Sequence, residues 1–255
     1  MRLYLHTSTR GSEYVSARPR FVQQVTFGRL RECGLVIPEG PPVLQLHYYP
    51  SNASMVPHLL LEELGASYEL VPVDRANNAQ KSDAYLALNP NGLIPVVVDG
   101  DLVLYETAAI CLHLADTHPD AALAPALGTP QRAHFYKWLM WLTNTLQATL
   151  IVYFYPERWA DTPEAIAQVK AHAEAKISGQ LDQLDAELAR VGGPWFLGAS
   201  FSVLDAYVLT LCRWTRGFGR PARSLPHLGP YLQRVLARAA SQRVFEREGL
   251  KTPFV

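Results

Sequence analysis

Two short segments of this sequence carry groups that could bind the backbone and the acidic end of a small peptide. In Ile94-Pro95, the proline stands at the start of an apolar run, where a strand is expected. Proline cannot donate to a strand ladder, so the backbone N–H and C=O of Ile94 are left to pair with another extended backbone. Glu106-Thr107 precedes a second apolar run, and a helix that starts there offers free N–H groups and a positive dipole end to a carboxylate. Each segment alone is typical of an ordinary strand or helix start, and their close spacing is what favours a peptide site.

The elements around these segments follow the pattern of a mixed sheet covered by helices. In chain order we expect a strand over 44–49, a helix over 55–65, a strand over 68–73, a short helix over 82–88, strands over 95–98 and 102–105, and a helix over 106–117. Ser54 is placed to cap the first helix and Gly65 to end it. Asp99-Gly100-Asp101 has the Asp-Gly signal of a tight hairpin. This order of elements predicts a thioredoxin-like domain.

The second half of the sequence predicts helices only. Thr129-Pro130 and Thr162-Pro163 each place an N-cap residue before a first-turn proline. The first pair opens a helical stretch that continues through Tyr153. After the second pair, apolar residues recur at steps of three and four over 166–188. This spacing predicts one buried stripe on a long helix.

Ser202 and Asp205 stand at the spacing of a helix-capping box. A serine at the N-cap and an acidic residue three positions later can each bond the other's backbone N–H. The apolar residues that follow predict a buried helix over 205–218. We therefore assign this pair to folding rather than to catalysis.

Residues 44–117 resemble the N-terminal domain of the glutathione transferase superfamily, and the resemblance extends over nearly all of 44–250. It is carried by the turn Tyr49–Ser54, by Ile94-Pro95 and by Glu106-Thr107. The resemblance implies that Pro95 follows a cis peptide bond and that the backbone of Ile94 pairs with the cysteinyl part of glutathione. It also implies that Thr107 meets the carboxylate of the γ-glutamyl end and that Glu106 meets its amine.

The fold class expected from pattern and resemblance together is α/β plus all-α. A thioredoxin-like, glutathione-binding domain over 43–120 is followed by an all-helical domain over 129–250. Residues 1–42 hold six Arg, three Glu and no Lys, without clear periodicity. An Arg-rich, acid-poor leader is typical of organelle targeting, but the three Glu and the scattered Gly and Pro favour a disordered extension or a start that is not the native one.

The turn after the first strand is where the resemblance implies that the sulfur of glutathione lies. A thiol attacks an electrophile as the thiolate, so the site must stabilise a negative charge on sulfur. Ser51, Asn52 and Ser54 are the candidate donors, just before a helix N-terminus whose dipole favours an anion. We expect Ser54 to be a cap and Asn52 or Ser51 to meet the sulfur, and the sequence does not decide between the last two. Ala53 stands where the bacterial beta type carries cysteine, which argues against chemistry through an enzyme thiol.

Four further residues have two readings each. Lys81 could reach the glycine carboxylate of glutathione, or it could be an ordinary solvated lysine. Tyr153, Tyr155 and Trp159 could line an apolar pocket for a second substrate, although aromatic residues this close together usually belong to a core.

Three functions are compatible with these residues. The preferred one is a glutathione transferase that conjugates the thiolate of its co-substrate glutathione to small apolar electrophiles. The second is a glutathione-dependent disulfide reductase, in which two glutathiones serve as the reductant. Family members with this activity use Thr or Asn donors in the turn, so Asn52 is compatible with it. The third is a non-catalytic glutathione-binding scaffold, because a fold does not fix an activity. The family resemblance also implies a homodimer and a role in detoxification.

The composition agrees with two cores in 255 residues, of which 49% are hydrophobic. Lys plus Arg and Asp plus Glu are both 23, so the chain lacks the basic excess of a nucleic-acid binder. The most apolar stretch, 138–155, contains several Thr, Asn and Gln and is a poor membrane span. The three cysteines lack CxxC spacing and require no oxidising compartment, which makes the cytoplasm the expected location. No cluster has metal-ligand spacing, so we expect no metal.

Overall fold

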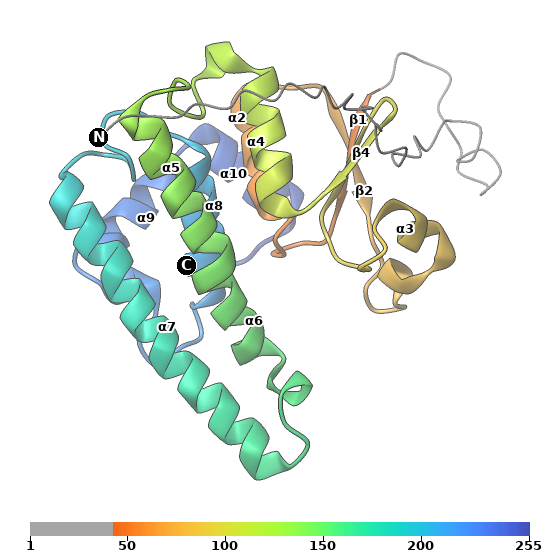
Figure 1. The fold of residues 1–255 in the computed structure, drawn as a ribbon, viewed down its shortest axis with the longest axis vertical. Helices are drawn as coiled ribbons and strands as arrows, with labels where there is room; N and C mark the ends of the chain where they lie inside the picture. Colours follow the sequence, from red (N-terminus) through yellow and green to blue (C-terminus); the bar gives the residue numbers. More distant parts are fainter. Residues whose placement is uncertain (1–42) are drawn as a thin grey trace, which may run out of the picture. The chain divides into compact units, whose positions relative to one another are not determined.

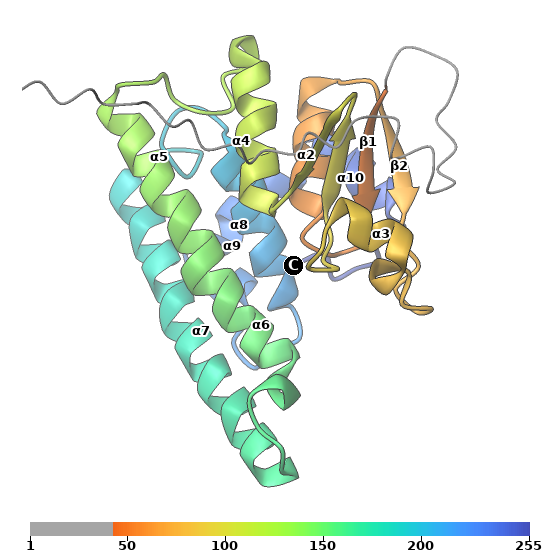
Figure 2. The same ribbon diagram turned by 45° about the vertical axis from the view of Figure 1, so that its right-hand side comes forward.

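We describe residues 43–255 of a computed structural model; the expected extension over 1–42 lies outside the described residues. The described chain forms a four-stranded mixed sheet that is followed by helices only (Figures 1 and 2). In chain order its strands and helices are β1 (Leu44–Tyr48), α2 (Met55–Leu64), β2 (Tyr68–Pro72), α3 (Asp83–Leu88), β3 (Val96–Asp99), β4 (Leu102–Tyr105), α4 (Thr107–Thr117), α5 (Pro130–Trp141), α6 (Ala148–Phe154), α7 (Pro163–Val191), α8 (Val203–Trp214), α9 (Leu228–Leu236) and α10 (Ala239–Arg247). The expected thioredoxin-like domain and all-helical domain are both confirmed.

The sheet has the strand order β2-β1-β3-β4. Strand β1 is parallel to β2 and antiparallel to β3, and β4 is antiparallel to β3. The register places His47 opposite Val96, and Val96 opposite Tyr105. The end of β1, the start of β3 and the end of β4 therefore lie at one end of the sheet, which we call the loop end. Every element expected in this domain lies within one residue of its predicted bounds.

Helix α2 lies at the centre of the structure. All of its residues from Met55 to Glu62 are buried, as expected of a helix that is covered on every side. It packs beside α4 on one face of the sheet (Figures 1 and 2), and α8 and α10 of the second half pack against it as well. The buried residues of the sheet domain and of the helical domain consequently form one hydrophobic core.

Ser54 does not cap α2, so this prediction is wrong. The residue stands directly before the helix, but its side chain makes no capping hydrogen bond. Its Oγ instead accepts from the N–H of Tyr49 at 3.2 Å and donates to the C=O of Tyr49 at 3.1 Å. The hydroxyl therefore closes the turn between β1 and α2. Gly65 ends α2 as expected, with a left-handed φ of 59°.

The caps predicted for the second half are present. Thr129 Oγ1 accepts from the N–H of Arg132, and Thr162 Oγ1 accepts from the N–H of Ala165. The first helical stretch continues from α5 into α6 through a π-helical turn over Leu142–Gln147. Of the predicted stripe on α7, Ala173, Ile177, Leu181, Leu184 and Leu188 are buried.

Helix α8 begins at Val203 and ends at Trp214, not at 205 and 218 as expected. The capping box explains the earlier start, because it makes Ser202 the N-cap residue and the next residue the first of the helix. The earlier end follows from Thr215, whose Oγ1 donates back to the C=O of Cys212 at 2.7 Å and accepts from the N–H of Ala222 at 2.9 Å.

Asp205 connects the start of α8 to two other segments. Its buried carboxylate accepts from the N–H of Ser202, the N–H of Phe196 and the hydroxyl of Tyr231, each at 2.8 Å. Burial raises the pKa of Asp205 to about 6, against the opposing effect of these hydrogen bonds. The assignment of Ser202 and Asp205 to folding is confirmed.

Glu62 of α2 connects the sheet domain to α10. Burial raises the pKa of this carboxyl, but hydrogen bonds from Arg243, Tyr68 and Arg247 outweigh burial and lower the pKa to about 2. Arg247 Nη1 donates to Glu62 Oε1 at 2.6 Å, and Arg243 Nη2 donates to the C=O of Glu62 at 2.8 Å. These contacts hold the last helix against α2.

Candidate functional site

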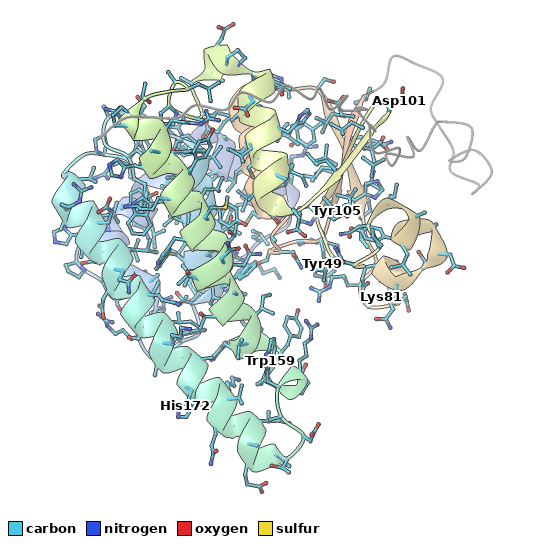
Figure 3. All side chains as sticks on the ribbon, in the orientation of Figure 1. Tyr49, Lys81, Asp101, Tyr105, Trp159 and His172 are labelled. Carbon is cyan, nitrogen blue, oxygen red and sulfur yellow. The ribbon has the colours of Figure 1, made fainter. Side chains whose placement is uncertain are left out.

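The three segments expected to bind a peptide meet at the loop end of the sheet. The turn Tyr49–Ser54 follows β1, Ile94-Pro95 precedes β3, and Glu106 follows β4. Tyr49 and Tyr105 lie at this end in Figure 3, and Asp101 of the β3–β4 hairpin lies at the opposite end. The strand register thus brings the turn and Glu106, which are more than fifty residues apart in the sequence, to the same end of the sheet.

The backbone of Ile94 is available for pairing. The Ile94–Pro95 peptide bond is cis, as expected. The side chains of Tyr85 and Asn89 hold the preceding carbonyl, because Tyr85 Oη and Asn89 Nδ2 donate to the C=O of Leu93 at 2.9 and 2.8 Å. Among the described residues, no hydrogen bond is formed by the N–H or the C=O of Ile94. Within that part of the chain, these two groups are therefore free to pair with an extended backbone.

The loop before Ile94 is fixed by a close approach at Gly92. Its φ of 61° lies in the left-handed region, and a Cβ there would come within 2.7 Å of Lys81 Nζ and 2.8 Å of the C=O of Gln80. Lys81 Nζ donates to the C=O of Asn91 at 3.1 Å. The exposed ammonium group of Lys81 is thus held against this loop.

Glu106 joins β4 to α4 with a strained backbone. Its φ of 72° is unusual for a residue other than glycine, and such strain is often found at functional sites. The side chain of Glu106 is exposed, whereas Thr107, the first residue of α4, is 7% exposed. The start of α4 therefore presents one carboxylate to solvent beside a nearly buried hydroxyl and the free N–H groups of a helix N-terminus.

The second half of the chain reaches α4 through Tyr207 of α8. Tyr207 is buried, and its hydroxyl donates to Gln147 Oε1 of the π-helical turn at 2.6 Å. Burial raises the pKa of Tyr207, so the hydroxyl stays protonated and remains a donor. Thr107 partly offsets this rise in the pKa of Tyr207.

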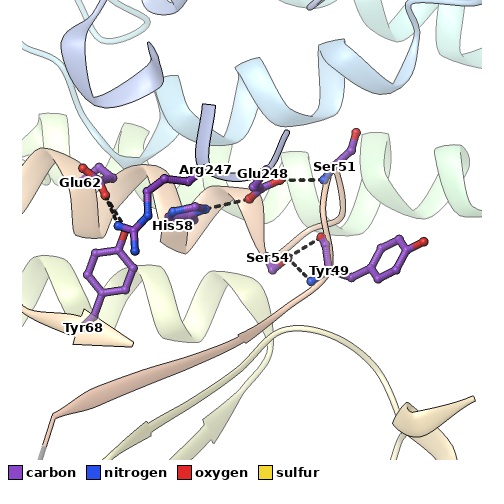
Figure 4. A network of polar contacts seen from close by, with 8 residues as sticks. All are labelled: Tyr49, Ser51, Ser54, His58, Glu62, Tyr68, Arg247 and Glu248. Atoms are coloured by element: carbon purple, nitrogen blue, oxygen red, sulfur yellow. Dashed lines mark hydrogen bonds and ion pairs between the residues drawn. The ribbon is translucent and has the colours of Figure 1, made fainter. Parts of the chain in front are cut away.

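Ser51 is held at all of its polar heavy atoms by the second half of the chain. Its N–H donates to Glu248 Oε2 at 2.7 Å, as Figure 4 shows. Its Oγ accepts from Arg213 Nε at 3.1 Å, and its C=O accepts from Trp214 Nε1 at 3.0 Å. These bonds support the left-handed φ of 60° at Ser51. The geometry of the turn thus depends on α8 and on the segment that follows α10.

Glu248 extends this connection to α2. Its side chain is fully buried, and its second oxygen, Oε1, lies 2.8 Å from Nδ1 of the equally buried His58 (Figure 4). A carboxylate only accepts, so His58 Nδ1 is the donor in this contact. Burial lowers the pKa of the neighbouring Arg213 to about 10. Sequence reasoning missed the pairing of Glu248 with His58, because the two residues are 190 residues apart and no local pattern links them.

Asn52 differs from the two serines in what its side chain contacts. Its Oδ1 accepts from the N–H of Ala53 at 2.6 Å, which fixes the orientation of the amide. The Nδ2 donor then makes no hydrogen bond with the described residues. Ser54 is completely buried and its hydroxyl is bonded to the backbone of Tyr49, and Ser51 Oγ is bonded to Arg213.

The described residues contain neither a membrane-spanning helix nor a metal-binding cluster. Within 43–255, no helix has the length and the apolar character that crossing a membrane requires. In the same residues, no group of three or more His, Cys, Asp or Glu is arranged to hold a metal ion. Cys111 and Cys212 are both buried free thiols.

Comparison with known proteins gives one consistent result. The family model described as glutathione S-transferase, N-terminal domain, matches residues 42–116, and that of the C-terminal domain matches residues 167–238. The chain is 31% identical to glutathione S-transferase GstA of Escherichia coli O157:H7, over 82% of this chain and 100% of the relative. It is also 31% identical to glutathione S-transferase 3 of Zea mays, over 82% of this chain and 96% of the relative.

Solved structures agree with these sequence matches. A glutathione transferase homologue from Sulfitobacter, crystallised with bound glutathione, superposes with a TM-score of 0.74 at 27% identity, over 82% of this chain and 99% of that one. A bacterial beta-class glutathione S-transferase from Sphingomonas chungbukensis has a TM-score of 0.70 at 32% identity, over 81% of this chain and 100% of that one.

Proposed function

Because the chain belongs to the glutathione transferase superfamily and is a glutathione transferase, we propose that it conjugates the thiolate of glutathione to small apolar electrophiles at the loop end of the sheet. The observation that carries this proposal is that the backbone N–H and C=O of Ile94 form no hydrogen bond with the described residues and lie near two other elements that we expect to contact glutathione. These are the turn that follows β1 and the N-terminus of α4, which the strand register brings to the same end of the sheet.

Glutathione would lie along this end as an added strand. Its cysteinyl N–H and C=O would pair with the C=O and N–H of Ile94, in the manner of strand addition. Its γ-glutamyl carboxylate would bind at Thr107, where the α4 dipole favours an anion, and its amine would bind the carboxylate of Glu106. The exposed ammonium of Lys81 is available for the glycine carboxylate if it leaves the C=O of Asn91.

Asn52 is our choice as the donor to sulfur. Ser51 and Ser54 also carry hydroxyls, but Ser54 is buried against Tyr49 and Ser51 is bonded to Arg213. The amide Nδ2 of Asn52 can donate to a thiolate, and a hydrogen bond to the charged form lowers the pKa of a thiol. Asn52 is not a base, so the proton of the thiol passes to water. The thiolate then forms a C–S bond, and the leaving group, such as chloride, departs with the electrons of the broken bond.

The activity is tested with glutathione and three readouts. Calorimetry should register binding of glutathione at millimolar concentration, and 1-chloro-2,4-dinitrobenzene should give a thioether. Reduction of hydroxyethyl disulfide is measured in parallel, because the disulfide reductase remains the alternative that Asn52 allows. Disulfide reduction without thioether formation would replace our proposal with that alternative. Glutathione binding without either reaction would leave a binding scaffold, and no heat at all would refute the site.

The role of Asn52 is tested by the pH dependence of conjugation. A hydrogen bond to a charged group contributes about 1.5–3 kcal/mol, which corresponds to about one to two pKa units. In Asn52→Ala, the apparent pKa of the bound thiol should therefore rise by about that amount. It is read from the pH profile of kcat/KM for the electrophile at saturating glutathione. Asn144→Ala, the same truncation at an exposed residue of the π-helical turn, is the control. An unchanged profile in Asn52→Ala would show that another group meets the sulfur.

Three broader properties complete the proposal. We propose a homodimer, a cytoplasmic location and a role in detoxification, in keeping with the family. Light scattering of the purified protein tests the first of these directly, and a monomer at working concentration would contradict it.

A further inference from the structure

Five residues form a surface cluster beside the turn, which we call the aromatic–arginine patch: Tyr49, Arg75, Tyr155, Arg158 and Trp159. Tyr49 is the first residue after β1, and Arg75 follows β2. The other three belong to the connection between α6 and α7. Tyr49 is 36% exposed and Trp159 is 51% exposed, which is high for large aromatic side chains. The patch thus offers aromatic rings and guanidinium groups to a ligand together.

Contacts link four members of the patch to one another, and Trp159 directly follows Arg158 in the sequence. The guanidinium of Arg75 lies 5.1 Å from the ring centroid of Tyr49. Its Nη2 donates to Tyr155 Oη at 3.1 Å, and the guanidinium of Arg158 lies 4.2 Å from the ring centroid of Tyr155. Cation–π contacts of this kind orient both guanidinium groups over flat apolar surfaces. The arginines are therefore positioned and not simply exposed.

A second set of contacts places the α6–α7 connection near the turn. Trp214 Nε1 donates to the C=O of Ser51, and the ring of Phe154 packs on Trp214 with centroids 6.3 Å apart. Phe154 directly precedes Tyr155, so two separate sets of contacts link the turn to the α6–α7 connection. Figure 3 shows Tyr49 near the loop end of the sheet and Trp159 near the end of α6.

The two guanidinium groups of the patch are not neutralised. Neither Arg75 nor Arg158 forms an ion pair with any residue of the described chain. Asp74, the carboxylate next to Arg75 in sequence, is bonded to the side chain of Asn77 at 2.6 Å. Two unpaired cations at one place attract an anion and raise its local concentration.

We propose that the electrophile is an aromatic compound that carries a carboxylate, with its ring against Tyr49, Tyr155 and Trp159 and its anion between Arg75 and Arg158. This inference rests on the proposed function, because it names the substrate class for the same site. In the reaction, the thiolate attacks the ring carbon that bears the leaving group and forms the C–S bond. Chloride leaves with the electrons of the C–Cl bond, and the carboxylate is unchanged.

The glycine carboxylate of glutathione is the other anion that could bind these arginines. The two sources predict different kinetics. If the arginines hold glutathione, their removal raises KM for glutathione and slows every electrophile alike. If they hold the electrophile, KM for glutathione stays the same and only the anionic electrophile is slowed.

The test compares 4-chloro-3,5-dinitrobenzoate with the uncharged 4-chloro-3,5-dinitrobenzamide, which has the same ring and leaving group. The carboxamide activates the ring more than the carboxylate does, so each kcat/KM is divided by the uncatalysed rate constant of the same electrophile with glutathione. We expect this ratio to be higher for the benzoate in the unaltered protein, with a preference that declines as salt is added. Arg75→Gln and Arg158→Gln should each lower kcat/KM for the benzoate roughly threefold to tenfold, as for a partly exposed ion pair, and leave the benzamide unchanged. Arg190→Gln, which removes the same charge near the other end of α7, is the control.

Each outcome has a separate meaning. An equal loss with both electrophiles, or a raised KM for glutathione, would assign the arginines to glutathione and overturn this inference. Equal ratios of kcat/KM to the uncatalysed rate constant for benzoate and benzamide in the unaltered protein would overturn it as well, although conjugation itself would stand. Absence of thioether with both electrophiles would instead refute the proposed function on which the inference rests.

Discussion

The substitution Glu248→Gln separates the charge of a buried carboxylate from its shape. In the structure, the two oxygens of Glu248 accept from two donors, the N–H of Ser51 at 2.7 Å and Nδ1 of His58 at 2.8 Å. Glutamine has nearly the same size but only one carbonyl oxygen. Its NH₂ group must therefore face one of the two donors. Against the N–H of Ser51 the hydrogen bond is lost, and against His58 the imidazole must carry its proton on Nε2, which has no partner among the described residues. In either case a buried donor is left without a partner.

The size of the effect follows from these two contacts. A hydrogen bond to a charged group contributes about 1.5–3 kcal/mol, and an unsatisfied buried donor costs about 1–3 kcal/mol. Since the two figures describe partly the same loss, we expect Glu248→Gln to lower the free energy of unfolding by about 2–4 kcal/mol. Ser51 holds a left-handed φ of 60°, which costs a residue other than glycine about 1–2 kcal/mol. Without the bond from Glu248, the turn should leave this conformation more often, and kcat/KM for conjugation should fall about tenfold.

The assay is urea unfolding together with steady-state conjugation to 1-chloro-2,4-dinitrobenzene. Glu246→Gln is the matched control, because Glu246 is exposed and stands two residues earlier on α10. Its free energy of unfolding should stay within about 0.5 kcal/mol of the unaltered value. Equal stabilities for the two variants would refute the burial argument. A destabilised Glu248→Gln protein that keeps its full kcat/KM under folding conditions would refute the link between Glu248 and the turn.

Two further substitutions test single groups. Thr107→Ala should leave the fold intact and raise the Kd for glutathione in calorimetry about tenfold, because a hydrogen bond of about 1.5 kcal/mol to the γ-glutamyl carboxylate is lost; an unchanged Kd would count against the carboxylate seat. Burial raises the pKa of Asp205 from its ordinary 3.8 to about 6, so the folded state binds the carboxyl proton more tightly than the unfolded state does. The contribution of the protonated carboxyl to stability is therefore lost as pH rises from about 4 to about 6. The loss is about 3 kcal/mol at 1.36 kcal/mol per pKa unit. Asp205→Asn should lack this decline in urea unfolding, and a pH-independent difference between the two proteins over that range would contradict the raised pKa.

The parts of the fold that sequence predicted are those with local signals. Period-two alternation gave β1, the Asp-Gly hairpin joined β3 to β4, and threonine-proline pairs marked the starts of α5 and α7. Each signal is contained within a few consecutive residues. The register of the sheet then brought the ends of these local elements together, so the segments expected at the site do meet.

The failed predictions concern residues whose partners compete. Ser54 has the residue type and position of an N-cap, but the backbone of Tyr49 offered its hydroxyl both a donor and an acceptor in the preceding turn. The end of α8 was set by Thr215, which bonds back to Cys212 and forward to Ala222. A short pattern indicates what a side chain can do, and it does not indicate which of several partners the folded chain will supply.

Ser51 shows why the functional reading of the turn depends on the second half of the chain. From sequence, Ser51 and Asn52 are equivalent polar candidates for the sulfur, and nothing nearby distinguishes them. In the structure, the partners of Ser51 are 162, 163 and 197 residues away. Among the described residues, the only partner of the Asn52 side chain is its neighbour Ala53. Long-range contacts therefore fix the conformation of one residue and leave the donor of the other for a ligand. Substitution of Glu248 should accordingly lower kcat/KM for conjugation, although Glu248 would not contact glutathione. Substitution of Asn52 should instead raise the pKa of the glutathione thiol.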